Sequence, residues 1–462
     1  FELSGRYDGS SKFPTNEQWG IFPSASFGWR ISDEGFMSNT KSWLDNLKLR
    51  LSAGTLGNGN VDPYSYLELM NVAKTSLLLN GGFQTYTSLP SLIPDNLTWE
   101  KATTYNVGLD ADMLKGKFNV AFDLYRRNTT DMYVSGPDLP QVLGSSAPKG
   151  NYADLKTIGW EFTIGWKDRF NVAGSDLAYN VKFMIWDSQS WITKYLGNEN
   201  QLLSSYYEGQ RIGDIWGYTI DGLFTSAEEI ANHADQSKIA VSKGKILLPG
   251  DLKFRDSNND GEVYRGKNTL DDHGDLSIIG NEEQRYRFGM NLGANYKGFG
   301  ISAFFQGVGK RDWYPDIESG YFWGQYNRHY GYYPTDQVGN MWIEGVNEDP
   351  NAYWPRLRTY MANATSKPMG VKNNRYLQNA AYVRLKSLTI DYSLPTNLTS
   401  KVKMSAVKFY LTGENLWTLT GLTKHTTNFD PEVIETGDSD IASNSNSENG
   451  YSYPMLKTFS LE

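Results

Sequence analysis

The chain has 462 residues, a formal net charge of -8 at pH 7 and no cysteine. The negative charge argues against non-specific binding to nucleic acid, and the lack of cysteine excludes disulfides, thiol nucleophiles and thiolate metal sites. Aromatic residues make up 14% of the chain and there are 45 glycines, a mixture that favours strands and turns over helices. No continuous apolar run reaches the roughly 18 residues that predict a membrane-spanning helix.

Segments in which apolar and polar residues alternate recur along the whole chain. Successive side chains of a strand point to opposite faces, so each such segment predicts a strand with one apolar and one polar face. In the clearest one, 286–296, every even residue is apolar and every odd residue is Arg, Asn or Gly. In chain order the segments with this pattern are 47–52, 105–113, 158–166, 286–296 and 407–412.

Two all-β folds produce this alternation. A soluble β-sandwich or propeller buries the apolar face in a core, whereas a transmembrane barrel turns it to lipid and its polar face to a wet lumen. The strands are long, about ten residues or more, as a tilted membrane-spanning strand requires. Their polar faces carry full charges, and aromatics such as Trp29, Trp166, Tyr296 and Tyr392 recur near strand ends. These features favour a transmembrane antiparallel β-barrel.

The connections between the predicted strands alternate between short and long. Outer-membrane barrels have short periplasmic turns and long outer loops, so this pattern predicts about twelve strands, which we expect to belong to a larger barrel. The longest connection, 187–283, is predicted to be one extracellular loop with small strands of its own and a helix starting near Ser226. The short connections are 115–117, 167–175 and 297–300; the long ones are 56–97, 129–152, 187–283, 311–376 and 418–451.

One predicted strand changes phase. Val383 and Leu385 share one face, whereas Leu388 and Ile390 share the other. The change falls near 386–387, where we predict a β-bulge.

Several motifs resemble those of the SusC/RagA family of TonB-dependent outer-membrane transporters. They occur in the family's order from one end of the chain to the other, and together they are specific although each alone is weak. They are the segments 5–13, 22–31, 250–261, 278–281, NAYWPR at 351–356, NAAYVRLK at 379–386, GENLWT at 413–418 and DPE at 430–432.

The resemblance implies that residues 1–462 are the C-terminal part of a barrel of about 22 strands. The family's N-terminal plug, which closes the lumen, and its TonB box would then lie outside this chain. It further implies an outer membrane of the Bacteroidetes type, import of glycans or peptides energised by TonB, and a SusD-like surface lipoprotein over the barrel. A dimer of such transporter–lipoprotein pairs is also consistent with it.

An acidic turn is the first candidate site. Asp256, Asn258 and Asp260 precede Gly261 with the spacing of oxygen ligands around a hard cation such as Ca²⁺. Position 12 of this pattern is a lysine, which excludes a standard EF-hand. We expect the Glu262 carbonyl and a later aspartate to complete a structural calcium site; Asp271 is the first choice, and Asp272 and Asp275 are the alternatives. The alternative is an Asx-rich turn without metal.

A cluster of aromatic residues is the second candidate site. Aromatic faces stack on sugar rings, and their hydroxyl and indole groups can form hydrogen bonds. For any single residue, packing against neighbouring loops or a lipoprotein lid is the favoured interpretation. The candidate substrate-binding residues are Trp313, Tyr314, Tyr321, Trp323, Tyr326 and Tyr330.

No catalytic motif is found. The chain has no G-x-S-x-G, H-E-x-x-H or P-loop sequence, and its four histidines lack zinc-ligand spacing. We therefore expect TonB-dependent import of an oligomeric nutrient without bond chemistry by this chain. The alternatives are a passive porin or adhesin barrel and, from another class, a β-rich glycoside hydrolase.

Overall fold

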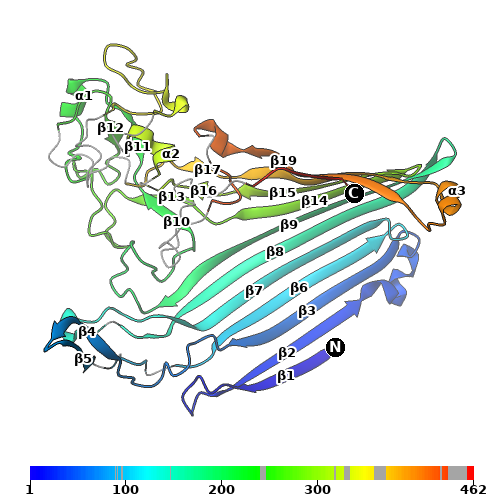
Figure 1. The fold of residues 1–462 in the computed structure, drawn as a ribbon, viewed down its shortest axis with the longest axis horizontal. Coiled ribbons are helices and arrows are strands. Elements are labelled where there is room, and N and C mark those ends of the chain that lie inside the picture. Colours follow the sequence, from blue (N-terminus) through cyan, green and yellow to red (C-terminus); the bar gives the residue numbers. More distant parts are fainter. Residues whose placement is uncertain are drawn as a thin grey trace. The chain divides into compact units, whose positions relative to one another are not determined.

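The alternating segments form the strands of one large antiparallel sheet (Figure 1). The computed structural model describes residues 1–461 except 89, 91, 95–96, 146, 240–245, 317–318, 327–332, 358–370, 427–428 and 435–454. Within these residues, twelve strands follow the order β1-β2-β3-β6-β7-β8-β9-β14-β15-β18-β19-β20. The predicted number of strands and the all-β barrel architecture are confirmed. The chain divides into two compact units, unit 1 (1–162 and 188–212) and unit 2 (163–187 and 213–462).

The first part of the chain consists of long strands joined by turns and loops. The sheet strands are β1 (Glu2–Gly9), β2 (Trp19–Arg30), β3 (Leu44–Asn58), β6 (Glu100–Met113), β7 (Phe118–Ser135), β8 (Lys149–Val172) and β9 (Ser175–Tyr195). The connections contain η1 (Ile31–Asp33), η2 (Gly35–Thr40), η3 (Gln141–Leu143) and a hairpin of β4 (Val72–Leu79) and β5 (Gly82–Thr87).

The second part combines sheet strands with elaborate connections. The sheet strands are β14 (Arg285–Tyr296), β15 (Phe299–Lys310), β18 (Tyr382–Ser393), β19 (Lys408–Thr420) and β20 (Thr458–Leu461). The connections contain β10 (Asp214–Gly217), β11 (Ile220–Leu223), β12 (Leu252–Phe254), β13 (Ser277–Asn281), β16 (Asp312–Trp313) and β17 (Gln378–Asn379). Their helices are α1 (Ala227–Ala231), α2 (Gly320–Trp323), η4 (Gly324–Tyr326), η5 (Thr335–Gln337), α3 (Thr396–Thr399), η8 (Ser400–Val402) and η9 (Gly421–Lys424).

The apolar face of the sheet in unit 1 is exposed. Val107 of β6 lies opposite Leu51 of β3 and Leu124 of β7, and these three side chains are 48%, 40% and 47% exposed. A soluble sandwich would bury such a row, so the exposure fits a face that contacts lipid. No helix among the described residues is long and apolar enough to cross a membrane.

The outward face of β6 and β7 marks the extent of the apolar band. Outward-facing residues of β6 are apolar from Met113 to Tyr105, which spans about 26 Å along the strand. A tilt of about 45° reduces this to roughly 19 Å across a membrane. On β7 the same face turns polar after Leu124, where the Nε of Arg126 donates to the Oδ1 of Asn128 at 3.0 Å. Leu109 therefore lies near the middle of the band.

The predicted bulge in β18 is confirmed. Leu385 pairs with Phe305 and Ser387 with Phe304, so two steps along β18 oppose one step along β15. On the other side of β18 the same two steps oppose three steps along β19, from Trp417 to Glu414. Asn415 within this extra length has φ 52°, a left-handed conformation that asparagine tolerates. The bulge shifts the phase so that side chains on either side of it, such as Trp417 and Ile390, are both exposed on the apolar face.

The connection between β9 and β14 contains two small sheets, β10–β13 and β11–β12, and helix α1. β9 continues to Tyr195, so this connection begins later than residue 187. The predicted helix start is confirmed, because the Oγ of Ser226 accepts from the backbone N–H of Glu229 at 3.1 Å. In unit 2 the connection leads into one end of β14, and the tight turn at Lys297 follows the other end (Figure 1). Its placement outside the cell stays a prediction.

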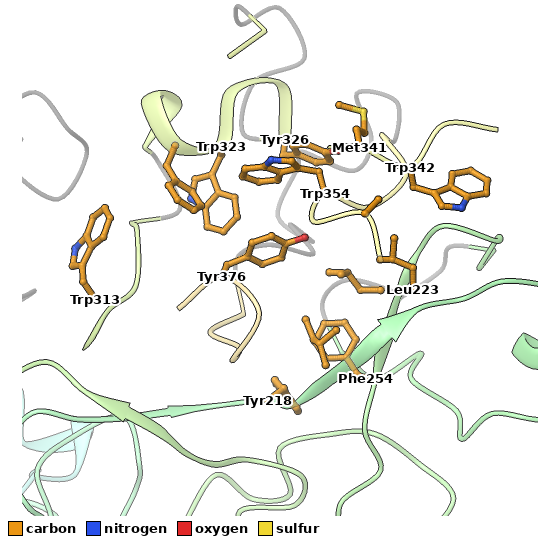
Figure 2. Packing of buried hydrophobic residues seen from close by; sticks show 14 of the residues in the cluster. Tyr218, Leu223, Phe254, Trp313, Trp323, Tyr326, Met341, Trp342, Trp354 and Tyr376 are labelled. Atoms are coloured by element: carbon orange, nitrogen blue, oxygen red, sulfur yellow. The ribbon is translucent and has the colours of Figure 1, made fainter. Parts of the chain in front are cut away.

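A hydrophobic core lies in the connections of unit 2 (Figure 2). We call it the loop core. It combines buried residues from the β9–β14, β15–β18 and β19–β20 connections, and it is rich in aromatic rings. Its members are Tyr218, Ile220, Leu223, Ile239, Leu252, Phe254, Val263, Trp313, Phe322, Trp323, Tyr326, Met341, Trp342, Ala352, Trp354, Tyr376, Ala380, Leu422, Phe429 and Ile434.

Candidate functional site

The polar face of unit 1 carries a charged network centred on Arg50 of β3. Its guanidinium donates to Asp110 of β6 at 2.7 Å and to Asp123 of β7 at 2.8 Å, and Asn106 donates to Asp123 at 2.8 Å. Gly108 lies beneath this network, where a Cβ atom would come within 2.7 Å of the Arg50 guanidinium and 2.5 Å of Asp123. Three neighbouring strands are thus cross-linked on the face opposite the apolar band, as expected for a polar lumen wall.

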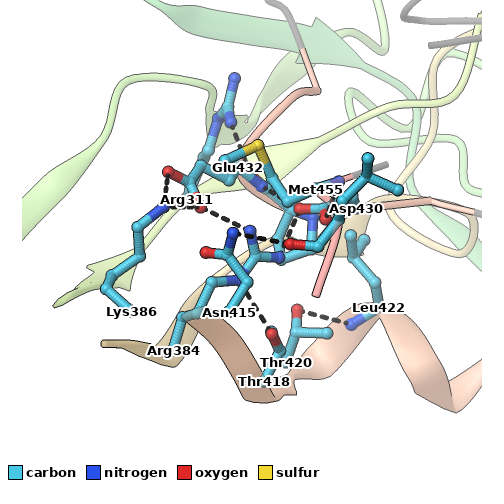
Figure 3. Close-up of polar contacts among 12 residues, drawn as sticks. Arg311, Arg384, Lys386, Asn415, Thr418, Thr420, Leu422, Asp430, Glu432 and Met455 are labelled. Carbon is cyan, nitrogen blue, oxygen red and sulfur yellow. Dashed lines mark hydrogen bonds and ion pairs between the residues drawn. The ribbon is translucent and has the colours of Figure 1, made fainter. Parts of the chain in front are cut away.

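A second network lies on the polar face of β18 (Figure 3). Here Arg384 contacts a segment of the β19–β20 connection, Phe429–Ile434, which we call the strap. Arg384 Nη2 donates to Asp430 at 2.6 Å, and Arg384 Nη1 donates to Glu432 at 2.5 Å. Lys386 Nζ donates to Glu432 at 2.8 Å. The Arg384 side chain is 3% exposed and Asp430 is 10% exposed, so these charges are paired away from solvent.

Arg311, directly after β15, contacts the backbone of the same strap. Its Nη1 donates to the Pro431 carbonyl at 3.2 Å and its Nη2 to the Ile434 carbonyl at 2.6 Å. Its Nε donates to the Glu282 carbonyl at 3.4 Å. Arg311 is 3% exposed, and a buried guanidinium needs such acceptors because its desolvation is costly. One side chain thereby joins three segments that are distant in sequence.

These network residues were not predicted as a site. Arg384, Lys386, Asp430 and Glu432 all lie within motifs that carry the family resemblance. Their opposite charges could have indicated the pairing, because the motif on β18 contributes the basic residues and the motif after β19 contributes the acidic ones.

The structure places most of the predicted aromatic site residues inside the loop core. Trp313 is 3% exposed, Trp323 1% and Tyr326 6%. The Tyr326 ring stacks on Trp354 with centroids 5.3 Å apart, and burial raises the pKa of its hydroxyl. These three rings therefore pack against protein, as the alternative interpretation expected, and offer no free face for a sugar.

The remaining aromatic candidates differ from one another. The Tyr314 hydroxyl donates to the Val371 carbonyl at 3.1 Å, and burial raises its pKa. Tyr321 is 37% exposed, so its ring could contact a ligand. Tyr330 lies outside the described residues. A role in substrate binding stays a prediction for this set.

The predicted calcium turn is closed by hydrogen bonds. Asp256 accepts from the backbone N–H of Asp260 at 3.3 Å and of Gly261 at 2.9 Å. Asp260 accepts from the Asn258 side chain at 2.9 Å and from the N–H of Glu262 at 2.9 Å. Such Asx-type bonds satisfy the carboxylates without a cation.

The later aspartate that joins this turn is Asp275. It is fully buried, and its carboxylate accepts from the N–H groups of Ser257 at 2.6 Å and Tyr264 at 2.8 Å. Asp271, the first choice from the sequence, instead accepts from Thr269, and this hydrogen bond lowers its pKa. Glu262 forms an ion pair with Lys238.

Among the described residues, no group of three or more His, Cys, Asp or Glu side chains is arranged to hold a metal ion. Calcium binding by the turn stays a prediction.

Comparison with known proteins identifies the class to which this fold and its two faces belong. Residues 1–416 match the family model described as TonB dependent receptor-like, beta-barrel. The chain belongs to this family, which places it in the outer membrane. The resemblance to SusC/RagA-type transporters inferred from the sequence is confirmed by individual relatives.

Curated relatives match over nearly the whole chain. TonB-dependent receptor P3 of Formosa agariphila is 27% identical over 486 aligned residues, which cover 100% of this chain and 43% of the relative. TonB-dependent receptor SusC of Bacteroides thetaiotaomicron is 27% identical, with 85% of this chain and 36% of the relative covered. The chain therefore spans less than half the length of these relatives.

Solved structures show the same fold. The structure described as the RagAB peptide transporter superposes with a TM-score of 0.69 at 21% identity, covering 90% of this chain and 42% of that chain. A "closed-closed" state of the RagAB peptide importer gives a TM-score of 0.68 at 20% identity.

Proposed function

We propose that the protein containing this chain imports an oligomeric nutrient across the outer membrane, energised by TonB and assisted by a SusD-like surface lipoprotein. The chain supplies barrel wall and outer loops to this process and no bond chemistry. The observation that carries the proposal is that each unit has a sheet with two unlike faces. In unit 1 the exposed apolar side chains of Leu51, Val107 and Leu124 lie opposite the charged network at Arg50. In unit 2 exposed apolar side chains such as Ile390 lie opposite the charged network at Arg384. In the family to which the chain belongs, such a wall surrounds a transport path.

The substrate class is the finer part of the proposal. We infer an oligosaccharide or an oligopeptide, because both are rich in the hydrogen-bonding groups that a polar, charged wall can contact. The similar RagAB structure is described as a peptide transporter. At 21% identity this likeness supports the fold alone, so both substrate classes belong in the test.

The test is growth of the source bacterium on defined oligomers as sole nutrient. We expect deletion of the gene to abolish growth on one class, oligosaccharides or oligopeptides, while growth on its monomers continues. Deletion of TonB should have the same effect. Growth that persists without TonB would overturn energy-coupled import and favour a passive porin. Release of product from oligosaccharides by the purified protein would instead indicate a hydrolase.

The lipoprotein partner is tested separately. The full-length protein, affinity-tagged and extracted in mild detergent, should retain a lipoprotein encoded beside it. The mass of this complex distinguishes one transporter–lipoprotein pair from a dimer of pairs. Purification of the transporter alone, with uptake intact after deletion of the lipoprotein gene, would contradict this part of the proposal.

A further inference from the structure

The strap has two faces with different partners. Its apolar residues, Phe429 and Ile434, are 8% and 3% exposed and belong to the loop core. The Phe429 ring lies 4.8 Å from Trp313 and 6.4 Å from Phe322, measured between centroids. The strap is therefore packed as part of the loop core on this side.

The other face of the strap contacts the sheet through charged groups. Asp430 and Glu432 pair with Arg384 and Lys386 of β18 (Figure 3). Arg384 is itself held by Thr418 of β19, whose hydroxyl accepts from Nε at 2.9 Å. Asp430 also accepts from the backbone N–H of Met455 at 3.2 Å, on the segment that leads into β20.

Attachment by charge differs physically from attachment by packing. The described contacts from the strap to β18 are ion pairs with good geometry, in which each carboxylate has at least two donors. Removing one partner of a buried pair leaves the other charge uncompensated, which is strongly destabilising. Apolar packing within the loop core does not depend on these charges.

We propose that the strap is an ionic latch that fastens the loop core to the β18–β19 wall and is released when the loop core moves. Arg311 fixes the strap backbone through the Pro431 and Ile434 carbonyls, and Arg384 and Lys386 fix its two carboxylates. The latch thereby regulates access to the polar face of the sheet. This regulatory role rests on the proposed transport function, whereas the fastening itself does not.

The fastening is tested by hydrogen–deuterium exchange of the full-length protein in detergent. Glu432→Gln should raise amide exchange at least tenfold in the strap, 429–434, while β14 and β15 stay protected. Lys408→Met is the control, because Lys408 of β19 forms an ion pair with Asp391 of β18 at 3.0 Å, which also involves β18 but lies outside the latch. Unchanged exchange of the strap in Glu432→Gln, with the control also unchanged, would overturn the proposal.

A second variant covers the case in which Glu432→Gln fails to assemble. The conservative variant Lys386→Arg keeps a cation beside Glu432 and leaves the Arg384 pair untouched, whereas Lys386→Met removes that cation. We expect the strap of Lys386→Met to exchange faster than that of Lys386→Arg. Equal exchange in the two would show that charge pairing does not hold the strap.

Release is tested by locking the latch. Lys386→Cys and Glu432→Cys, joined by a short bifunctional thiol cross-linker in a background without other reactive cysteines, replace the ion pair by a covalent link. Strap exchange should return to the wild-type rate and uptake should stop. Uptake that continues in the cross-linked protein would show that transport does not require the strap to detach from β18. If the wild type itself shows no uptake, the proposed function fails and the exchange results on fastening still stand.

Discussion

At the scale of single residues, the segment before the strap contains a histidine that stays neutral. His425 stacks on Tyr353 with ring centroids 3.7 Å apart and planes 3° from parallel. Burial lowers the pKa of His425 to about 4, and the nearby cations Lys424 and Arg375 act in the same direction. The guanidinium carbon of Arg375 also lies 6.0 Å from the centroid of the Tyr353 ring. The neutral imidazole is therefore the form that this environment stabilises.

The pKa of His425 is lower in the folded protein than its ordinary value of 6.5. The stabilisation contributed by the neutral His425 ring is therefore complete above about pH 6.5 and is lost as the pH falls through about 4. His425→Phe keeps an aromatic ring on Tyr353 but cannot titrate. We expect the melting temperature of the wild type, minus that of His425→Phe, to decrease between pH 6.5 and pH 4. A difference that is constant over this range would contradict the assignment.

At the scale of the strands, the orientation of each face decides which substitutions the barrel tolerates. Leu109 lies opposite Leu49 on β3 and Phe122 on β7, and it is 40% exposed on the apolar face. Ser52, on the neighbouring strand β3, lies opposite Asn106 on the polar face. A charge introduced at Leu109 would therefore face lipid, whereas a charge introduced at Ser52 would face the polar lumen.

Leu109→Asp should impair assembly of the barrel. A basic residue at the bilayer midplane costs about 2–4 kcal/mol and an acidic one somewhat less. We expect a smaller folded fraction, measured as the heat-modifiable band of outer-membrane preparations in gel electrophoresis. Ser52→Asp, the matched control, should assemble like the wild type. Equal folded fractions for the two variants would count against a lipid-facing apolar band.

At the scale of the molecule, the connections of unit 2 behave as one packed body. The loop core draws residues from three connections that are separated by long stretches of sequence. Trp354, 1% exposed, lies at its centre with Tyr326, Trp323 and Tyr376 within 5.3 to 6.1 Å, measured between ring centroids. Loss of this ring should loosen all three connections together and not only its own.

Trp354→Ala should destabilise the loop core by about 3–5 kcal/mol, the usual cost of a large cavity. We expect faster amide exchange in 218–224, 320–326 and the strap, 429–434, simultaneously, with β14 and β15 unaffected. Tyr321→Ala, at a ring that is 37% exposed, is the control and should change little outside its own turn. Faster exchange confined to the neighbourhood of residue 354 would show that the connections are independent.

The sequence by itself predicted the features that depend on near neighbours. Period-two alternation identifies strands and their faces because it follows from the geometry of a single extended segment. The same holds for the bulge near Lys386, where the phase of the alternation changes, and for the helix start at Ser226, where capping is local. The family was also accessible, because its motifs are read in order along the chain.

Only the tertiary structure decided how the side chains are used. Arg384 and Asp430 are 46 residues apart in sequence, so no local pattern shows that they form a pair. Asp275 rather than Asp271 supports the acidic turn, because chain folding and not spacing determines which carboxylate meets the free N–H groups. The aromatic residues near Trp323 are of the types that bind sugars at protein surfaces, but in the structure they are buried in a hydrophobic core. Burial is a property of three connections packed together, so it cannot be determined from any one of them.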